Sequence, residues 1–251
     1  MKCERYVIKL GGSLITDKNR PYTIRKDVVA EAASTLSEAH HRDIRLVVIH
    51  GGGSFGHYEV EAIEKEKGLL FSSDAPRIQA SMLRLAIEIV GSLLARGVPA
   101  SLHPPHTLCA RWPSNCWLQP IIRDVEIGLV PVTYGDALPG GDDNVVIVSG
   151  DDLALSIASL LGTGTCLVFA MDKGGVLGED GRVLPIIRPG SRIARLEGEN
   201  YDVTGGIERK LAAAFEAARR GITTVITSIE GMRRIIIEGE IPRERGTLVK
   251  V

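Results

Sequence analysis

Short apolar runs recur along the chain, separated by longer stretches in which apolar residues recur every three to four positions. The runs are rich in β-branched residues and bounded by glycine, which is typical of strands covered on both faces. They lie at residues 6–10, 46–50, 130–133, 145–148, 165–171 and 223–227. The helical stretches lie at residues 25–39, 75–95, 151–161 and 206–220. This alternation predicts one α/β domain over residues 1–251, a three-layer α/β/α sandwich with a mainly parallel central sheet.

The helix predicted from Ala75 carries a single apolar stripe. Its members recur at three- and four-residue steps and are Ile78, Met82, Leu85, Ile89 and Leu93. A stripe of this kind is usual for a helix that packs on a core or on a second subunit. A second interpretation is that the near end of the helix forms the wall of an apolar substrate pocket.

Composition and charge exclude several classes of function. The chain has 251 residues, 44% of them hydrophobic, which is enough for a large core. Lys and Arg number 30 against 31 Asp and Glu, so a net charge of -1 gives no field that attracts nucleic acid or an anionic membrane. Charged residues precede only a short apolar run at the N-terminus, unlike a signal peptide or a membrane span. We expect no nucleic-acid or membrane partner and a cytoplasmic location.

The cysteines suggest neither a disulfide framework nor a metal site. Cys3, Cys109, Cys116 and Cys166 contain no C-x-x-C pair. A chain of this size does not need disulfides to fold, so we interpret them as reduced thiols. His103 and His106 precede Cys109, but the spacing matches no common zinc pattern. We therefore predict no metal-binding residues.

Three glycine-rich turns are the main chemical signal. They read K-L-G-G-S at residues 9–13, H-G-G-G-S-F-G-H at 50–57 and T-G-G at 204–206, and none is a Walker A loop. Successive exposed amides before a helix bind anions. The carboxyl ends of parallel strands meet at one edge of a sheet, so the first two turns should converge there. The sequence predicts two neighbouring anion sites.

Lysines accompany these turns and point to phosphoryl transfer. Lys9 lies in an apolar strand, where a charge is costly unless it serves a site. Lys210 lies one turn into a helix that begins at the third turn, and Lys18 follows the first. Phosphoryl transfer requires that two ligands are held in line while positive groups, such as lysines, neutralise the phosphate oxygens. A salt bridge for Lys9 and a solvated surface position for Lys18 and Lys210 are the alternatives.

Two consecutive aspartates begin the helix predicted at residues 151–161. Capping explains one of them, and the other is then free to hold the ammonium groups of Lys9 and Lys210. We assign this second role to Asp152, with Asp151 as the alternative.

These motifs, in this order, resemble the amino acid kinase superfamily and, within it, the isopentenyl phosphate kinases of archaeal type. The resemblance covers almost the whole chain. It rests on K-L-G-G-S-L-I-T-D-K at 9–18, H-G-G-G-S-F-G-H at 50–57, Y-G-D at 134–136, S-G-D-D at 149–152 and D-V-T-G-G-I-x-x-K at 202–210.

The resemblance implies ATP as donor, Mg²⁺ as its counter-ion, isopentenyl phosphate as acceptor and a homodimer. Residues 1–145 would form the acceptor-binding and dimerisation lobe, and residues 146–251 the nucleotide-binding lobe. The implied catalytic residues are Lys9, Lys18, His57, Asp152 and Lys210. The implied acceptor-binding residues are Gly51, Gly52, Gly53, Gly56, His57 and Gly150. The implied nucleotide-binding residues are Lys9, Gly11, Gly12, Ser13, Asp172, Gly205, Gly206 and Lys210.

Two histidines differ in what they indicate. His57 closes the second glycine turn, and an imidazole there could donate to a phosphate monoester, whose charge would favour the protonated ring. Superfamily members that phosphorylate carboxylates or uridylate generally lack this histidine. His50 ends a buried strand, and we interpret it as a structural histidine with its hydrogen bonds satisfied. A phosphate acceptor is already ionised near neutral pH, so the reaction needs no general base.

One departure from the family pattern lies on the nucleotide side. The family commonly carries a T-D-V-D-G-V-like string, whereas residues 171–176 read M-D-K-G-G-V, which keeps Asp172 but brings Lys173 and Gly174. Two further functions stay open at this point. One is a fosfomycin-kinase-like activity on a small phosphonate, and the other is a nucleotide-responsive regulatory protein without transfer activity.

Overall fold

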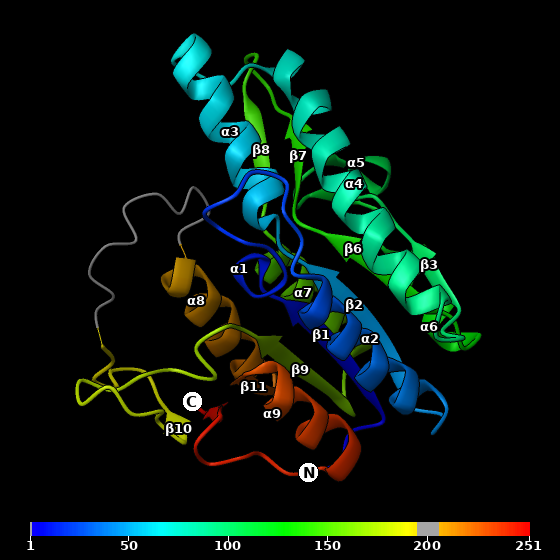
Figure 1. The fold of residues 1–251 in the computed structure, drawn as a ribbon, viewed down its shortest axis with the longest axis vertical. Coiled ribbons are helices and arrows are strands. Elements are labelled where there is room, and N and C mark those ends of the chain that lie inside the picture. Colours follow the sequence, from blue (N-terminus) through cyan, green and yellow to red (C-terminus); the bar gives the residue numbers. More distant parts are fainter. Residues whose placement is uncertain (1, 195–205) are drawn as a thin grey trace.

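The computed structural model describes residues 2–194 and 206–251, and its centre is an eight-stranded sheet (Figure 1). The strand order is β10-β12-β11-β9-β1-β2-β6-β3. Strands β11, β9, β1, β2, β6 and β3 are parallel, β12 is antiparallel to β11, and β10 is parallel to β12. The strands are β1 (Arg5–Leu10), β2 (Arg45–His50), β3 (Ala100–Leu102), β6 (Val130–Tyr134), β9 (Thr165–Ala170), β10 (Ile186–Ile187), β11 (Thr223–Thr227) and β12 (Gly246–Val249).

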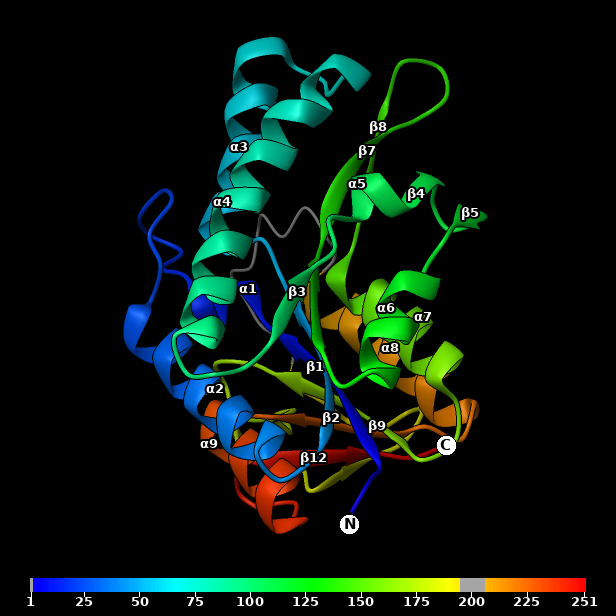
Figure 2. The same cartoon turned by 90° about the vertical axis from the view of Figure 1, so that its right-hand side faces the viewer.

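Helices cover both faces of this sheet, so the predicted three-layer fold is confirmed (Figure 2). On one face lie α2 (Lys26–His40), α4 (Ala75–Leu94) and α9 (Ile229–Arg233) with the π-helix η2 (Arg234–Glu238). On the other face lie α6 (Gln119–Glu126), α7 (Gly150–Leu161) and α8 (Gly206–Arg219). Tyr6, Ile8 and Leu10 of β1 face the first layer and Val7 faces the second. Side chains alternate between the two faces of a strand, so Lys9 lies on the same face as Val7, toward α7.

A second, smaller unit of structure projects beyond one end of the sheet (Figures 1 and 2). It consists of α3 (Gly53–Lys67), the first half of α4 and the antiparallel hairpin of β7 (Asp136–Pro139) and β8 (Val145–Val148). A separate core joins them, made of side chains that include Val60, Ile63, Ile78, Met82 and Tyr134. The run at 145–148 does form a strand, but the prediction that it belongs to the central sheet is wrong. Its first three residues are only half-buried, as suits a hairpin.

Helix α3 is absent from the predicted elements. Its last two turns read E-A-I-E-K-E-K, and the few apolar positions give too weak a stripe to indicate a helix. The remaining short elements are α1 (Gly12–Ile15), η1 (Ser72–Asp74), α5 (Pro105–Leu108), β4 (Cys109–Arg111) and β5 (Asn115–Cys116). The longest helix, α4, has 20 residues, and within the described ranges none is both long and apolar enough to cross a membrane.

The four cysteines form two disulfides, so the expectation of reduced thiols is wrong. Cys3 bonds Cys166, and Cys109 bonds Cys116. Cys166 lies in β9 opposite Tyr6 of β1, and Cys3 precedes β1 closely enough for a Cα–Cα distance of 5.8 Å. Cys109 and Cys116 lie directly opposite each other in the β4–β5 hairpin. Strand pairing brings each pair together, and sequence spacing alone does not reveal it.

Candidate active site

A cleft of about 1000 Å³ opens at the carboxyl ends of β1, β2 and β9, where the sheet meets α3 and α4. Its volume is at the upper end of the roughly 300–1,000 Å³ of ordinary ligand pockets. It is lined by nearly all of the predicted site residues that the structure describes. These are Lys9, Gly11, Gly12, Ser13, Lys18, Gly51, Gly52, Gly53, Gly56, His57, Gly150, Asp172, Gly206 and Lys210. Gly205 lies outside the described residues.

The first and second glycine turns touch each other, as their position after adjacent parallel strands predicts. A Cβ atom on Gly12 would lie 2.2 Å from the backbone nitrogen of Gly53. Gly53 has φ +47°, a conformation that favours glycine. A Cβ atom on Gly51 would lie 3.6 Å from Lys9 Nζ, and one on Gly150 would lie 3.4 Å from Lys9 Cε. Because these positions are glycines, the backbone at Gly12, at Gly51–Gly53 and at Gly150 can pack closely around Lys9.

Asp151 joins the two predicted lysines. Its Oδ1 lies 2.8 Å from Lys9 Nζ and 3.1 Å from Lys210 Nζ, and all three residues are less than a tenth exposed. Although burial opposes its ionisation, the two ammonium groups lower the pKa of Asp151 to about 2. Burial and the charge of Lys9 lower the pKa of Lys210 to about 8. Near neutral pH, two positive charges thus share one negative charge, and the group as a whole attracts an anion.

Asp152 does not hold the lysines, so its predicted role is wrong and the alternative, Asp151, is correct. Asp152 Oδ2 accepts from Arg209 Nη2 at 2.6 Å, and neither residue lines the cleft. Ser149 caps α7 and accepts from the backbone N–H of Asp151. A helix turns about 100° per residue, so consecutive side chains in its first turn point in different directions. Only Asp151 faces β1.

His57 lies in the first two turns of α3, half-buried, and lines the same cleft. Lys18 lines it from the loop that joins α1 to α2, and Ser13 lines it from α1. The structure therefore brings together Lys9, Lys18, His57 and Lys210, which are separated by up to 201 positions in the chain and come from four elements or loops.

His50 is only partly satisfied by hydrogen bonds. Burial, followed by the charge of Lys9, lowers the pKa of His50 to about 4, so the ring is neutral. Its Nδ1 lies 3.1 Å from the carbonyl oxygen of Gly51, to which a neutral ring donates. Its Nε2 is buried and has no partner among the parts of the chain that the structure describes. The ring stacks on Tyr134 at 5.1 Å and orients the carbonyl of the second glycine turn.

An apolar wall lies beside His57. It is formed by Val60 of α3, Ile78 and Met82 of α4, and Ile147 of β8. A Cβ atom on Gly56 would lie 3.1 Å from Met82 Sδ, so this glycine lets α3 approach α4 closely. The stripe on α4 is therefore divided between the cleft and the core. Its near end lines the cleft, and Leu85, Ile89 and Leu93 pack on the sheet.

Arg25 and Asp172 form an ion pair in the lining of the cleft, near the end of β9. Arg25 Nη1 lies 2.9 Å from Asp172 Oδ1, and the two side chains are 37% and 54% exposed. The pair connects the loop before α2 to the end of β9. The sequence prediction included Asp172 but not Arg25, because no local pattern distinguishes Arg25 from other helix-start residues.

The histidines near Cys109 contact aspartates. His103 Nε2 lies 2.7 Å from Asp124 Oδ2, and His106 Nδ1 lies 2.7 Å from Asp136 Oδ2. Across residues 2–194 and 206–251, no group of three His, Cys, Asp or Glu side chains could hold a metal ion.

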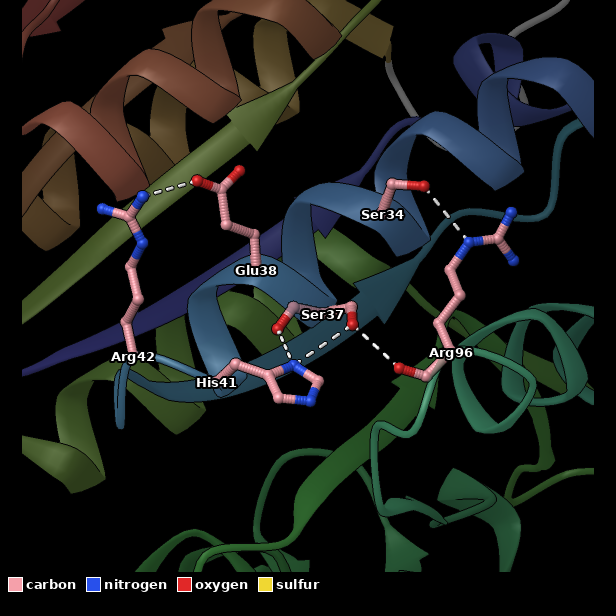
Figure 3. Close-up of a pocket in the computed structure, with 6 residues that line it drawn as sticks. All are labelled: Ser34, Ser37, Glu38, His41, Arg42 and Arg96. Atoms are coloured by element: carbon pink, nitrogen blue, oxygen red, sulfur yellow. Dashed lines mark hydrogen bonds and ion pairs between the residues drawn. The ribbon is translucent and has the colours of Figure 1, made fainter.

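A second hollow lies at the surface of α2 and the turn that follows it, beside Arg96 (Figure 3). Its polar side chains contact one another: Arg42 donates to Glu38, Arg96 donates to Ser34, and Ser37 donates to the carbonyl of Arg96. These groups satisfy each other, so the hollow offers no convergent set of unpaired groups to a ligand.

Comparisons with known proteins agree with this geometry. Residues 4–228 match the model of the amino acid kinase family. The chain is 36% identical over 253 residues to an isopentenyl phosphate kinase of Haloferax volcanii, covering 97% of this chain and 98% of the relative. It is 30% identical over 251 residues to one of Thermoplasma acidophilum, covering 97% and 96%. The product complex of the T. acidophilum enzyme superposes with a TM-score of 0.77 at 24% identity, covering 98% and 100%.

The contact of Asp151 with two buried lysines leads to a stability prediction. We expect Asp151→Asn to lower the free energy of unfolding at pH 7 by about 3–5 kcal/mol, because it leaves buried ammonium groups without a counter-charge. Asp152→Asn is the matched control and should cost about 1 kcal/mol or less, since the pair with Arg209 is only partly buried, with side chains 27% and 37% exposed. Urea denaturation of both variants measures the difference. Equal losses would contradict the placement of Asp151.

Proposed function

We propose that this chain, which belongs to the amino acid kinase family, transfers the γ-phosphoryl group of ATP to isopentenyl phosphate and forms isopentenyl diphosphate and ADP. The observation that carries the proposal is one cleft that combines two kinds of surface. Buried lysines and glycine amides suit phosphates, and an apolar wall beside His57 suits a short hydrocarbon tail. The similar proteins from Haloferax volcanii and Thermoplasma acidophilum are both named isopentenyl phosphate kinase.

The donor occupies the side of the cleft nearer β9 and α8. In this proposal Gly11, Gly12 and Ser13 offer backbone amides to the phosphates of ATP, and Lys9 and Lys210 offer ammonium groups. Gly205, Gly206 and Asp172 complete the nucleotide-binding residues. Asp151 is a positioning residue, because it holds both ammonium groups side by side without meeting the phosphates itself.

The acceptor phosphate lies on the side nearer β2 and α3. Gly51, Gly52, Gly53, Gly56 and Gly150 would surround it with backbone, and His57 would donate a hydrogen bond. The apolar wall of Val60, Ile78, Met82 and Ile147 would contact the tail. A small polar phosphonate such as fosfomycin would leave this wall without a partner, so the wall favours an isoprenoid acceptor.

The chemistry is direct in-line transfer between two anions. The terminal oxygen of the acceptor phosphate attacks the γ-phosphorus, and the bond from that phosphorus to the β,γ-bridging oxygen breaks, which leaves ADP. The acceptor oxygen is already ionised, so no base removes a proton. Lys9, Lys18 and Lys210 neutralise charge that spreads over the transferring oxygens, and they reduce the repulsion that would keep the two substrates apart.

Mg²⁺ would enter with ATP. Mg²⁺ is usually held by one or two carboxylates, substrate phosphates and water, and not by an all-protein cage. The donor set of the cleft fits this mode, because Asp151 is engaged with two lysines while Asp172 lies exposed at the end of β9. When bound, the ion neutralises charge on the nucleotide phosphates.

The proposed enzyme has two lobes in each chain and two chains in the assembly. Residues 1–145 would supply most of the acceptor site and the dimer contact, and residues 146–251 most of the nucleotide site. We propose a homodimer that acts in the cytoplasm on small-molecule substrates, with no nucleic-acid or membrane partner. Exposed apolar residues on α4, Ile87 and Leu94, are candidates for the dimer contact.

A coupled assay of ADP release tests the proposed activity. Purified protein with ATP should turn over isopentenyl phosphate at least about tenfold faster than fosfomycin or water, because only the isoprenoid gains from apolar contact, roughly 0.8 kcal/mol for each buried CH₂. Turnover of fosfomycin without turnover of isopentenyl phosphate would overturn the choice of acceptor. Binding of ATP with no transfer to any acceptor would indicate a regulatory protein.

His57 gives a prediction specific to the acceptor. We expect His57→Ala to lower kcat/KM for isopentenyl phosphate by about 10- to 100-fold, which corresponds to a lost charged hydrogen bond of about 1.5–3 kcal/mol. The dissociation constant of ATP should stay within about twofold. His41→Ala, at the exposed C-cap of α2, is the control. Equal weakening of ATP and acceptor binding would contradict the assignment.

Lys210 predicts the alkaline limb of the pH profile. Its pKa of about 8 means that the free enzyme loses this positive charge as the pH rises through 8. The value of kcat/KM for ATP should therefore fall about tenfold per pH unit above pH 8. In Lys210→Arg the guanidinium stays charged, so the limb should move to higher pH even if the rate is lower. If the alkaline limb stays at the same pH in Lys210→Arg, a group other than Lys210 causes it.

A further inference from the structure

The loop at residues 16–25, called here the Lys18 loop, joins α1 to α2 and borders the cleft. Its base is fixed to the glycine turns. Thr16 Oγ1 donates to the carbonyl of Gly12 at 2.8 Å and accepts from the backbone N–H of Ser54 at 2.9 Å. Where the loop turns back toward α2, the N–H of Thr23 donates to Ser54 Oγ at 3.2 Å. These contacts fix the two ends of the loop but not its tip.

The outer part of the loop is held by a different contact. The hydroxyl of Tyr22 donates to Glu59 Oε1 on α3, and the other carboxylate oxygen of Glu59 accepts from Arg77 Nε on α4 at 2.7 Å. The Tyr22 ring also meets Phe55 and Tyr58 edge-on, with centroids 5.7 and 5.1 Å away. Tyr22 itself has φ 51°, a conformation that non-glycine residues seldom adopt without support from their surroundings.

The carboxylate of Glu59 is the centre of this network. Glu59 is only 7% exposed, so it requires charged or hydrogen-bonding partners. The ion pair with Arg77 already supplies Glu59 with a counter-charge and joins α3 to α4. The hydrogen bond from Tyr22 is an additional contact, and it joins the Lys18 loop to α3. Burial and the neighbouring carboxylate raise the pKa of Tyr22 to about 12, so the hydroxyl remains a donor.

The positions of these residues relate the network to the proposed reaction. Glu59 follows His57 by two residues on the same helix, and Tyr22 follows Lys18 by four residues in the same loop. We propose that Tyr22 and Glu59, with Arg77 behind them, are positioning residues that hold the Lys18 loop against the helix of His57. This inference rests on the proposed function, in which Lys18 and His57 meet the substrate phosphates.

Kinetics of Tyr22→Phe tests the proposal, because the substitution removes the hydroxyl and keeps the ring. We expect kcat to fall about tenfold while KM for ATP stays within about twofold. In a Lys18→Met background, the same substitution should lower the remaining rate by less than about twofold, since the loop then has no ammonium group to position. Tyr6→Phe, which removes a buried hydroxyl at the start of β1, should leave kcat unchanged in both backgrounds.

Two further variants separate positioning from folding. Glu59→Gln keeps an acceptor oxygen for Tyr22 and should lower kcat less than Tyr22→Phe does. Arg77→Lys keeps the counter-charge of Glu59 and should leave kcat within about twofold. A purely structural role would instead lower the melting temperature in Tyr22→Phe and reduce the rate equally with and without Lys18.

Limited trypsin digestion tests the anchoring without any reaction. The bond between Lys18 and Asn19 lies in an exposed stretch, and Pro21 protects the bond after Arg20. Tyr22→Phe should speed cleavage after Lys18 about tenfold relative to other sites, as measured by mass spectrometry, while Tyr6→Phe should not. If wild-type protein fails to turn over isopentenyl phosphate, the proposed function is wrong and the cleavage rate alone decides the anchoring. Unchanged cleavage, or an equal loss of kcat in both Lys18 backgrounds, would overturn the inference.

Discussion

The site depends on one buried carboxylate between two buried ammonium groups. Lys9 at the end of a central strand would be costly alone, and Lys210 beside it would add repulsion. Asp151 lowers both costs, and the three side chains keep an excess positive charge while each is less than a tenth exposed. An anion that reaches them meets charges that are already fixed in place. Everything else about the site follows from placing β1, α7 and α8 so that these three side chains touch.

The glycine turns make that placement useful. Because β1 lies between β2 and β9, its carboxyl end is next to the turn after β2 on one side and next to Asp172 on the other. The backbone of Gly12 approaches that of Gly53 too closely for any Cβ atom. The first two glycine turns are thereby in contact with each other and with Lys9. Side chains at these glycines would separate the turns.

The sequence predicted what depends on local pattern and strand order. Apolar runs gave the parallel sheet, and the lysine in β1 pointed to the site. What it could not predict depends on how elements rotate and pair. Whether Asp151 or Asp152 faces β1 depends on the rotation of α7 over the sheet. Helix α3 has too few apolar positions to be recognised, and the bond from Cys3 to Cys166 requires β1 to pair with β9. The contact between Tyr22 and Glu59 likewise joins residues 37 positions apart.

The departure from the family pattern at Lys173 lies outside the buried group of Lys9, Asp151 and Lys210. It follows Asp172, whose pair with Arg25 is about half exposed, so solvent screens any change of charge there. Asp151 is 8% exposed and holds the two ammonium groups that are proposed to meet the transferring phosphates. The change at Lys173 therefore lies in the exposed segment after β9, next to the Arg25–Asp172 pair. It leaves the buried group intact, and with it the electrostatics on which the transfer step depends.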